Sequence, residues 1–189
     1  MTTALLIIDV QHALCTGDEA AFDIDRVIER INAIGTKART VGAPVIHIQH
    51  EEDSGSLQFG ADGWQLAAGL ATLPGDLRVR KTTPDSFHQT ELHRLLHEWG
   101  ITNLVICGLQ SDFCVDTTVR RALALGYDVV LVADAHSTVD NGVLSAAQIT
   151  AHHNTTLAHM TSFGSRVAVT LASEVRIGPN PLVHPPDRR

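Results

Sequence analysis

The chain begins with a run of five consecutive apolar residues, 4–8 (Ala-Leu-Leu-Ile-Ile), which ends at Asp9. A strand with one face in water alternates apolar and polar residues, whereas a strand buried on both faces is apolar throughout. Strands of the second kind occur in parallel sheets that helices cover on both sides. The run therefore predicts a buried strand over residues 4–10, in a domain that also contains helices.

Strand-like and helix-like segments alternate along the rest of the chain. Strands are expected at residues 4–10, 45–49, 77–81, 103–107, 128–133 and 167–171. Helices are expected where apolar residues recur three or four positions apart, at residues 25–41, 90–99, 114–125 and 145–160. Such alternation is typical of an α/β protein, in which right-handed crossovers between mostly parallel strands produce a three-layer α/β/α sandwich. For a chain of 189 residues we expect one domain over residues 1–177, followed by a proline-rich tail, 178–189.

Charge and cysteine content narrow the possible functions. The formal net charge of −7 disfavours a nucleic acid or an anionic membrane surface as the main partner. Three cysteines, an odd number in a chain without an export signal, indicate reduced thiols. The apolar run at residues 4–8 is too short to span a membrane. We therefore expect a cytoplasmic protein that acts on a small molecule, with no nucleic-acid and no membrane partner.

The segment 103–121 combines a strand, a tight turn and a helix around Cys114, with the apolar run broken at Gly108. Cys114 is expected in or beside the first helical turn, where unpaired backbone N–H groups and the helix dipole favour a thiolate. This position predicts a nucleophile whose pKa lies below the free-cysteine value of about 8.5. Asp112 and Asp116 would oppose thiolate formation, so we expect their side chains to point away.

Two other ionisable residues follow the carboxyl ends of predicted strands, which is where sites form in open parallel sheets. Asp9, taken alone, is interpreted equally well as a turn residue at the end of a strand. Lys81 continues the apolar face of the strand at 77–81, although a lysine that extends to the surface is the simpler interpretation of that residue alone. Together with Cys114 they form a chemically useful set. The carboxylate can remove the thiol proton and return it to a leaving group, and the ammonium stabilises both anions.

Several ordered motifs resemble those of the isochorismatase-like cysteine hydrolases, over about residues 4–135. They are Leu-Leu-Ile-Ile-Asp-Val-Gln (5–11), Pro-Gly-Asp-Leu-Arg-Val-Arg-Lys (74–81), Asp-Ser-Phe-His-Gln-Thr (85–90), Val-Ile-Cys-Gly-Leu-Gln-Ser-Asp-Phe-Cys-Val (105–115) and Gly-Tyr-Asp-Val-Val-Leu-Val-Ala-Asp-Ala (126–135). The resemblance implies a Rossmann-like sandwich with a six-stranded sheet. It also implies a catalytic triad, which falls on Asp9, Lys81 and Cys114.

The resemblance further implies how the site would be completed. The family carries a non-proline cis peptide before the nucleophile, at Leu109–Gln110 by position, and the N–H groups of Gln110 and Cys114 would bind an oxyanion. The candidate walls of the substrate pocket are Gln11, Trp64, Phe87 and Phe113, although the aromatic residues could instead belong to the core. Members usually form closed oligomers, so we expect a homo-oligomer, either a dimer or a tetramer.

No metal and no other cofactor is expected. The nicotinamidase branch of the family binds a metal through an Asp-x-His pattern after the second strand, and the corresponding residues 48–50, Ile-Gln-His, lack the aspartate. The leading hypothesis is a cysteine hydrolase that cleaves the C–N bond of a small amide or lactam through a thioester on Cys114. Two alternatives stay open. One is vinyl-ether hydrolysis of isochorismatase type, a branch that generally lacks the nucleophile, and the other is a non-hydrolytic, redox-active thiol protein.

Overall fold

The computed structural model describes residues 2–178, and the tail expected at 178–189 therefore lies outside the described residues except for Gly178. The strands are β1 (Thr3–Ile8), β2 (Val45–His50), β3 (Leu77–Lys81), β4 (Asn103–Leu109), β5 (Asp128–Ser137) and β6 (Val167–Thr170). The helices are α1 (His12–Cys15), α2 (Ile24–Thr40), α3 (Leu92–Glu98), α4 (Asp116–Ala124) and α5 (Ala146–Ala158), and a π-helical turn, η1 (Ser111–Val115), precedes α4. No helix within residues 2–178 is long and apolar enough to cross a membrane.

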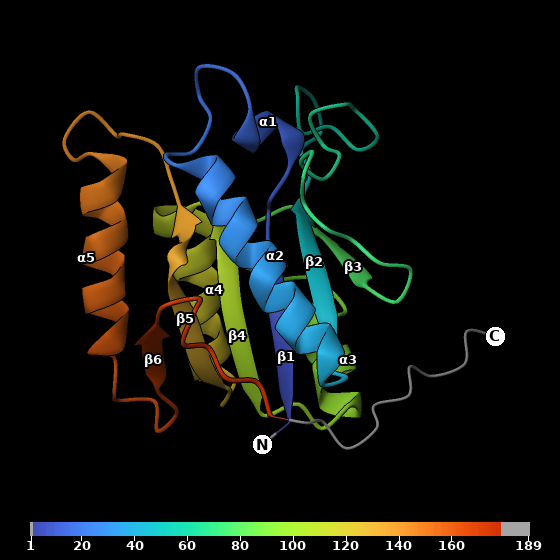
Figure 1. Ribbon diagram of the computed structural model, residues 1–189, viewed down its shortest axis with the longest axis vertical. Coiled ribbons are helices and arrows are strands. Elements are labelled where there is room, and N and C mark those ends of the chain that lie inside the picture. Colours follow the sequence, from blue (N-terminus) through green and yellow to red (C-terminus); the bar gives the residue numbers. More distant parts are fainter. Residues whose placement is uncertain (1, 179–189) are drawn as a thin grey trace.

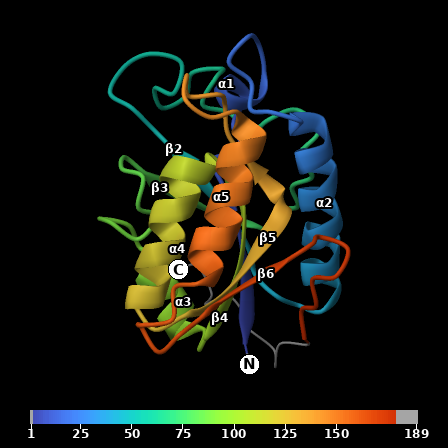
Figure 2. The ribbon, with the colours of Figure 1, turned by 90° about the vertical axis from the view of Figure 1, so that its left-hand side faces the viewer.

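The six strands form one sheet in the order β3-β2-β1-β4-β5-β6, and every neighbouring pair is parallel. Helix α2 covers one face, while α3, α4 and α5 cover the other, as Figures 1 and 2 show. The predicted three-layer α/β/α sandwich is confirmed. Because all strands run the same way, their carboxyl ends and the loops that follow them gather at one edge of the sheet.

Strand β1 is buried on both faces, as its apolar run predicts. Leu5 and Ile7 pack in the core beneath α2. Leu6 and Ile8 pack in the core beneath α3 and α4 on the opposite side. The continuous apolar run thus serves two cores at once, and it places the residue that follows it, Asp9, at the centre of the sheet edge.

Element boundaries differ from the prediction mainly at this edge. Strand β5 continues to Ser137, beyond the expected end at residue 133, because its last polar side chains are buried and hydrogen-bonded. Strand β4 continues to Leu109 through Gly108, whose φ of 117° belongs to the left-handed region. A Cβ atom at Gly108 would overlap the carbonyl oxygen of Ile8, so a glycine is required where β4 passes β1. The short helix α1 was not expected.

Candidate active site

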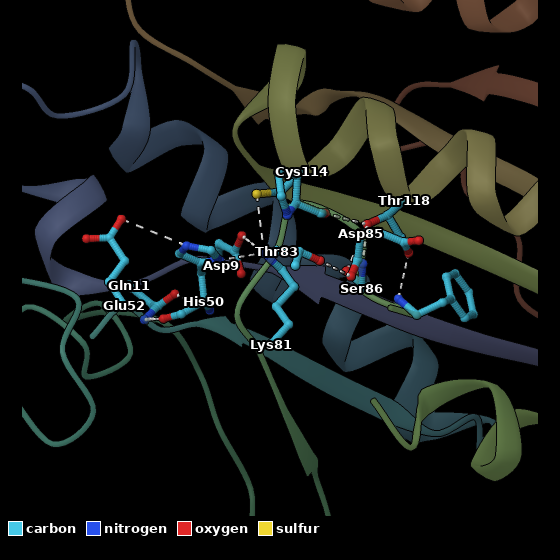
Figure 3. Close-up of polar contacts among 12 residues, drawn as sticks. Asp9, Gln11, His50, Glu52, Lys81, Thr83, Asp85, Ser86, Cys114 and Thr118 are labelled. Atoms are coloured by element: carbon cyan, nitrogen blue, oxygen red, sulfur yellow. Dashed lines mark hydrogen bonds and ion pairs between the residues drawn. The ribbon is translucent and has the colours of Figure 1, made fainter. Parts of the chain in front are cut away.

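The three side chains expected to meet do meet, at the carboxyl edge of the sheet (Figure 3). Asp9 follows β1 with a φ of 50°, Lys81 ends β3, and Cys114 lies in η1 just after β4. The Lys81 ammonium reaches across the end of β2 and donates to Asp9 Oδ2 at 2.7 Å and to Cys114 Sγ at 3.2 Å. A carboxylate, an ammonium and a thiol from three separate parts of the chain thus converge on one point.

Burial makes these contacts strong. The side chains of Lys81 and Asp9 are 0% and 1% exposed, whereas Cys114 is partly exposed and therefore reachable from solvent. Charges that water does not screen interact more strongly than a surface pair. Asp9 Oδ1 is buried and has no hydrogen-bond partner among the described residues. One oxygen of the carboxylate therefore holds the ammonium, and the other is left to accept a proton.

His50 is a fourth member of the cluster, and the sequence analysis did not include it. Its Nδ1 lies 3.3 Å from Lys81 Nζ, and because an ammonium only donates, Nδ1 is the unprotonated nitrogen. Its Nε2 lies 3.9 Å from a carboxylate oxygen of Glu52 (Figure 3). Burial and the charge of Lys81 lower the pKa of His50, which favours the neutral ring. The signal that could have found it is the pairing of strand ends, since His50 lies directly opposite Lys81 in the β2–β3 register.

The expectation that Cys114 has a lowered pKa is wrong. Burial, followed by the charge of Asp9, raises the pKa of Cys114 to about 12, and the opposing effect of Lys81 is smaller. Cys114 also lies in a π-helical turn before α4, and not at the start of that helix. Cys114 is therefore a thiol near pH 7, and its sulfur could attack a carbonyl only if a base removed the proton at the same time.

This raised pKa predicts how Cys114 reacts with a simple alkylating agent. Because only the thiolate reacts, the rate of modification by iodoacetamide should increase about tenfold per pH unit between pH 7 and pH 9. The measurement is the mass of the Cys114 peptide at each pH. A rate that is already constant above pH 7 would instead indicate a thiolate at rest and would contradict the raised pKa.

The two aspartates beside the nucleophile point away from it, as expected. Asp112 accepts a hydrogen bond from the Thr138 hydroxyl at 2.6 Å. Asp116 accepts one from Arg120 at 2.8 Å and pairs with His153 at 3.1 Å. Neither carboxylate is directed at Cys114, so Asp9 is the acidic residue whose charge raises the pKa of the thiol.

The four candidate pocket residues have different environments. Gln11 is fully buried, and its amide binds the backbone of His50 and of Trp64, so it joins two walls of the site and does not line it. Trp64 lines a cavity of about 580 Å³ that also includes Lys81. Phe87 stacks on Tyr127 within the hydrophobic core, with ring centroids 5.9 Å apart.

Phe113, the fourth candidate, precedes Cys114 and is 54% exposed at the sheet edge. The peptide bond between Leu109 and Gln110 is cis, in the position that the family resemblance implies. Gln110 lines a second cavity, of about 620 Å³. No cluster of three or more histidine, cysteine, aspartate or glutamate side chains suited to a metal ion occurs within residues 2–178.

Comparison with known proteins identifies related sequences. The isochorismatase domain family matches residues 3–172. Streptothricin hydrolase from Streptomyces noursei is 39% identical over 188 residues, which cover 97% of this chain and 66% of that protein. A second streptothricin hydrolase from the same organism is 41% identical over 138 residues, 72% of this chain and 55% of its own length. The chain thus spans less than two thirds of the length of either protein.

A more distant relative and two solved structures complete the comparison. Ureidoacrylate amidohydrolase RutB from Caulobacter vibrioides is 28% identical over 171 residues, 71% of this chain and 76% of that protein. A crystal structure of an isochorismatase family protein is 39% identical with a TM-score of 0.82, covering 88% of this chain and 96% of that one. A crystal structure of an isochorismatase from Pseudomonas putida KT2440 is 32% identical with a TM-score of 0.83, and the match covers 92% of this chain and 90% of that one.

Proposed function

This chain belongs to the isochorismatase family of hydrolases, and from that premise we propose that it hydrolyses the C–N bond of a small amide or lactam through a thioester on Cys114. The observation that carries the proposal is the position of the Lys81 ammonium, 2.7 Å from a carboxylate oxygen of Asp9 and 3.2 Å from the sulfur of Cys114. A base, a cation and a nucleophile in mutual contact are what acyl transfer by a cysteine needs.

The proposed reaction begins with a thiol, because the pKa of Cys114 is raised in the resting site. Asp9 accepts the thiol proton on its unpaired oxygen as the sulfur forms a bond to the substrate carbonyl carbon. The tetrahedral oxyanion is bound by the backbone N–H groups of Gln110 and Cys114. The C–N bond then breaks, and the amine or ammonia leaves with the proton from Asp9. Water finally hydrolyses the thioester, which releases the acid and restores the thiol.

Lys81 supports the same steps without taking part in bond formation. In a partly buried site at an effective dielectric constant near 20, unit charges about 4 Å apart interact by about 4 kcal/mol. The ammonium therefore stabilises the sulfur as its proton moves to Asp9. Its remaining contact, with Nδ1 of His50, leaves all three of its N–H groups engaged and its position defined.

Amide hydrolysis is favoured over the alternatives by three observations. One relative is named an amidohydrolase, and two are named hydrolases of streptothricin. A vinyl-ether hydrolase needs no cysteine nucleophile, whereas here the thiol is the partly exposed member of a buried ion-pair cluster. A redox sensor would not need a carboxylate oxygen held beside the thiol, since a buried carboxylate suppresses the reactive thiolate.

Two screens, each with and without EDTA, test the proposal: ammonia release over primary amides, and the mass of the ring-opened amino acid over lactams. We expect hydrolysis that chelation does not change, together with an acyl adduct on the Cys114 peptide when the reaction is quenched in acid. Prior alkylation of Cys114 should remove activity in proportion to the fraction modified. Hydrolysis that leaves no adduct and survives alkylation would refute the thioester route. Oxidation by peroxide without hydrolysis of any amide or lactam would favour the redox alternative.

A further inference from the structure

A chain of buried hydrogen bonds lies behind the nucleophile turn, outside the triad. The Ser111 hydroxyl, at the start of η1, is 2.8 Å from Nδ1 of His136 on β5. Nε2 of His136 is 2.9 Å from Oδ1 of Asn154 on α5, and the Asn154 amide nitrogen donates to the carbonyl oxygen of Ala133 at 3.0 Å. The Ser111 hydroxyl is also 3.3 Å from that of Thr150. Ser111 and His136 are 0% and 2% exposed.

The direction of each hydrogen bond follows from the far end of this chain. Because the Asn154 nitrogen donates to Ala133, its oxygen is the atom that faces His136, and that oxygen only accepts. His136 therefore carries its proton on Nε2, and its bare Nδ1 accepts from the Ser111 hydroxyl. Burial lowers the pKa of His136 to about 4, so the ring is neutral near pH 7, as this arrangement requires.

We propose that His136 is a positioning residue that fixes the nucleophile turn through the bond that its Nδ1 accepts from Ser111, and so aligns the oxyanion-binding N–H groups of Gln110 and Cys114, while Asn154 keeps the ring proton on Nε2. This inference rests on the proposed function, because it assigns a task to the same N–H groups. Ser111 directly follows Gln110, and η1 contacts both β5 and α5, so the hydroxyl is the point at which the sheet and α5 hold the turn.

The same residues do not form a second catalytic site. A serine, a histidine and an amide linked in this order by hydrogen bonds resemble a serine nucleophile with its base. However, Ser111 is 0% exposed, so no substrate can reach its oxygen. Its hydroxyl proton already belongs to a bond that holds the turn. The network therefore acts on the reaction only through the position of the backbone. Displacing catalytic groups by about 1 Å can cost about 10²-fold in rate.

Two substitutions of His136 separate positioning from mere structural support. In His136→Asn the side-chain oxygen takes the place of Nδ1, so the bond from Ser111 is kept and the link to Asn154 is lost. In His136→Gln the terminal amide takes the place of Nε2, so the link to Asn154 is kept, while Ser111 loses the acceptor at 2.8 Å and keeps only the Thr150 hydroxyl, at 3.3 Å. For the fastest amide of the ammonia screen, we expect His136→Gln to lower kcat by about 10- to 100-fold with KM changed less than about threefold. His136→Asn should lose less than about threefold in kcat, although each variant removes one hydrogen bond.

A second readout needs no amide substrate. Acetaldehyde adds to a cysteine as a thiohemiacetal, whose oxygen occupies the oxyanion site, and so it protects Cys114 from iodoacetamide. Protection should need about tenfold more acetaldehyde in His136→Gln than in His136→Asn. Ser111→Ala, which removes only the hydroxyl, should lower kcat and weaken acetaldehyde protection as much as His136→Gln does. The double variant Ser111→Ala/His136→Gln should lose no more kcat than either single variant.

Equal losses in His136→Gln and His136→Asn, or additive losses in the double variant, would overturn the positioning role. These outcomes differ from a failure of the proposed function. If no amide is hydrolysed, or if hydrolysis does not need Cys114, the reaction has been misassigned, and acetaldehyde protection still tests the alignment of the turn.

Discussion

Replacing Cys114 by alanine is expected to lower kcat/KM for amide hydrolysis by about 10⁴- to 10⁶-fold, the range found when a covalent nucleophile is removed. The oxyanion-binding N–H groups and Asp9 remain in this variant, but no thioester forms and water has no preceding acyl-enzyme to attack. Ammonia release measures the loss, and acid-quenched mass spectra should no longer contain an acylated protein. The fold should persist, because Cys114 is only a partly buried member at the margin of the core.

Cys15→Ala is the matched control for Cys114→Ala. Cys15 is also partly exposed, and burial also raises its pKa to about 12, but the shift has no contribution from an acid or an amine. A thiol without such partners cannot be activated in the way proposed for Cys114, so this variant should keep its activity within about twofold. Equal losses in both variants would mean that removing a thiol disturbs the protein generally, and would leave Cys114 without a special role.

The sequence was sufficient to predict the fold because its constraints are local and redundant. The apolar run of β1 specifies a strand buried on both faces, and that burial requires helices above and below the sheet. Parallel strands then place their carboxyl ends together, which is why Asp9, Lys81 and Cys114 could be predicted to meet. That rule places the three residues at one edge of the sheet, but their contact also requires that β3, β1 and β4 lie close together in the strand order, which the rule does not supply.

What the sequence could not supply depends on contacts between distant segments. His50 joins the cluster through the register between β2 and β3, which periodicity does not determine. Burial and the charge of Asp9 raise the pKa of Cys114, and the charge of Lys81 lowers it. Which of them prevails depends on distances and burial that only the folded structure determines. The bond from Ser111 to His136 likewise requires that β5 extend to Ser137, whereas the sequence predicted this strand only to residue 133.

Lys81→Met is expected to damage both activity and stability. The substitution leaves the Asp9 carboxylate buried without its cation, and breaking a buried ion pair by removing one partner typically costs about 3–5 kcal/mol. Ammonia release should fall by about 10²- to 10⁴-fold, the contribution typical of a group that supports proton transfer. Thermal unfolding followed by circular dichroism measures the loss of stability, and kcat for ammonia release measures the loss of activity.

The double variant Asp9→Leu/Lys81→Met separates these two effects. Replacing both members of a buried ion pair by apolar residues is often neutral or even stabilising, so the melting temperature should rise from that of Lys81→Met towards that of the unmodified protein. It should stop short of that value because leucine is strained at the φ of 50° that Asp9 adopts. Activity should not return, because the base has been removed together with the cation. A stable double variant that still hydrolyses the amide would show that the ion pair is a structural feature of the sheet edge. A stable and inactive one would show that the ion pair serves the chemistry of the Cys114 thiol and is not needed for the fold.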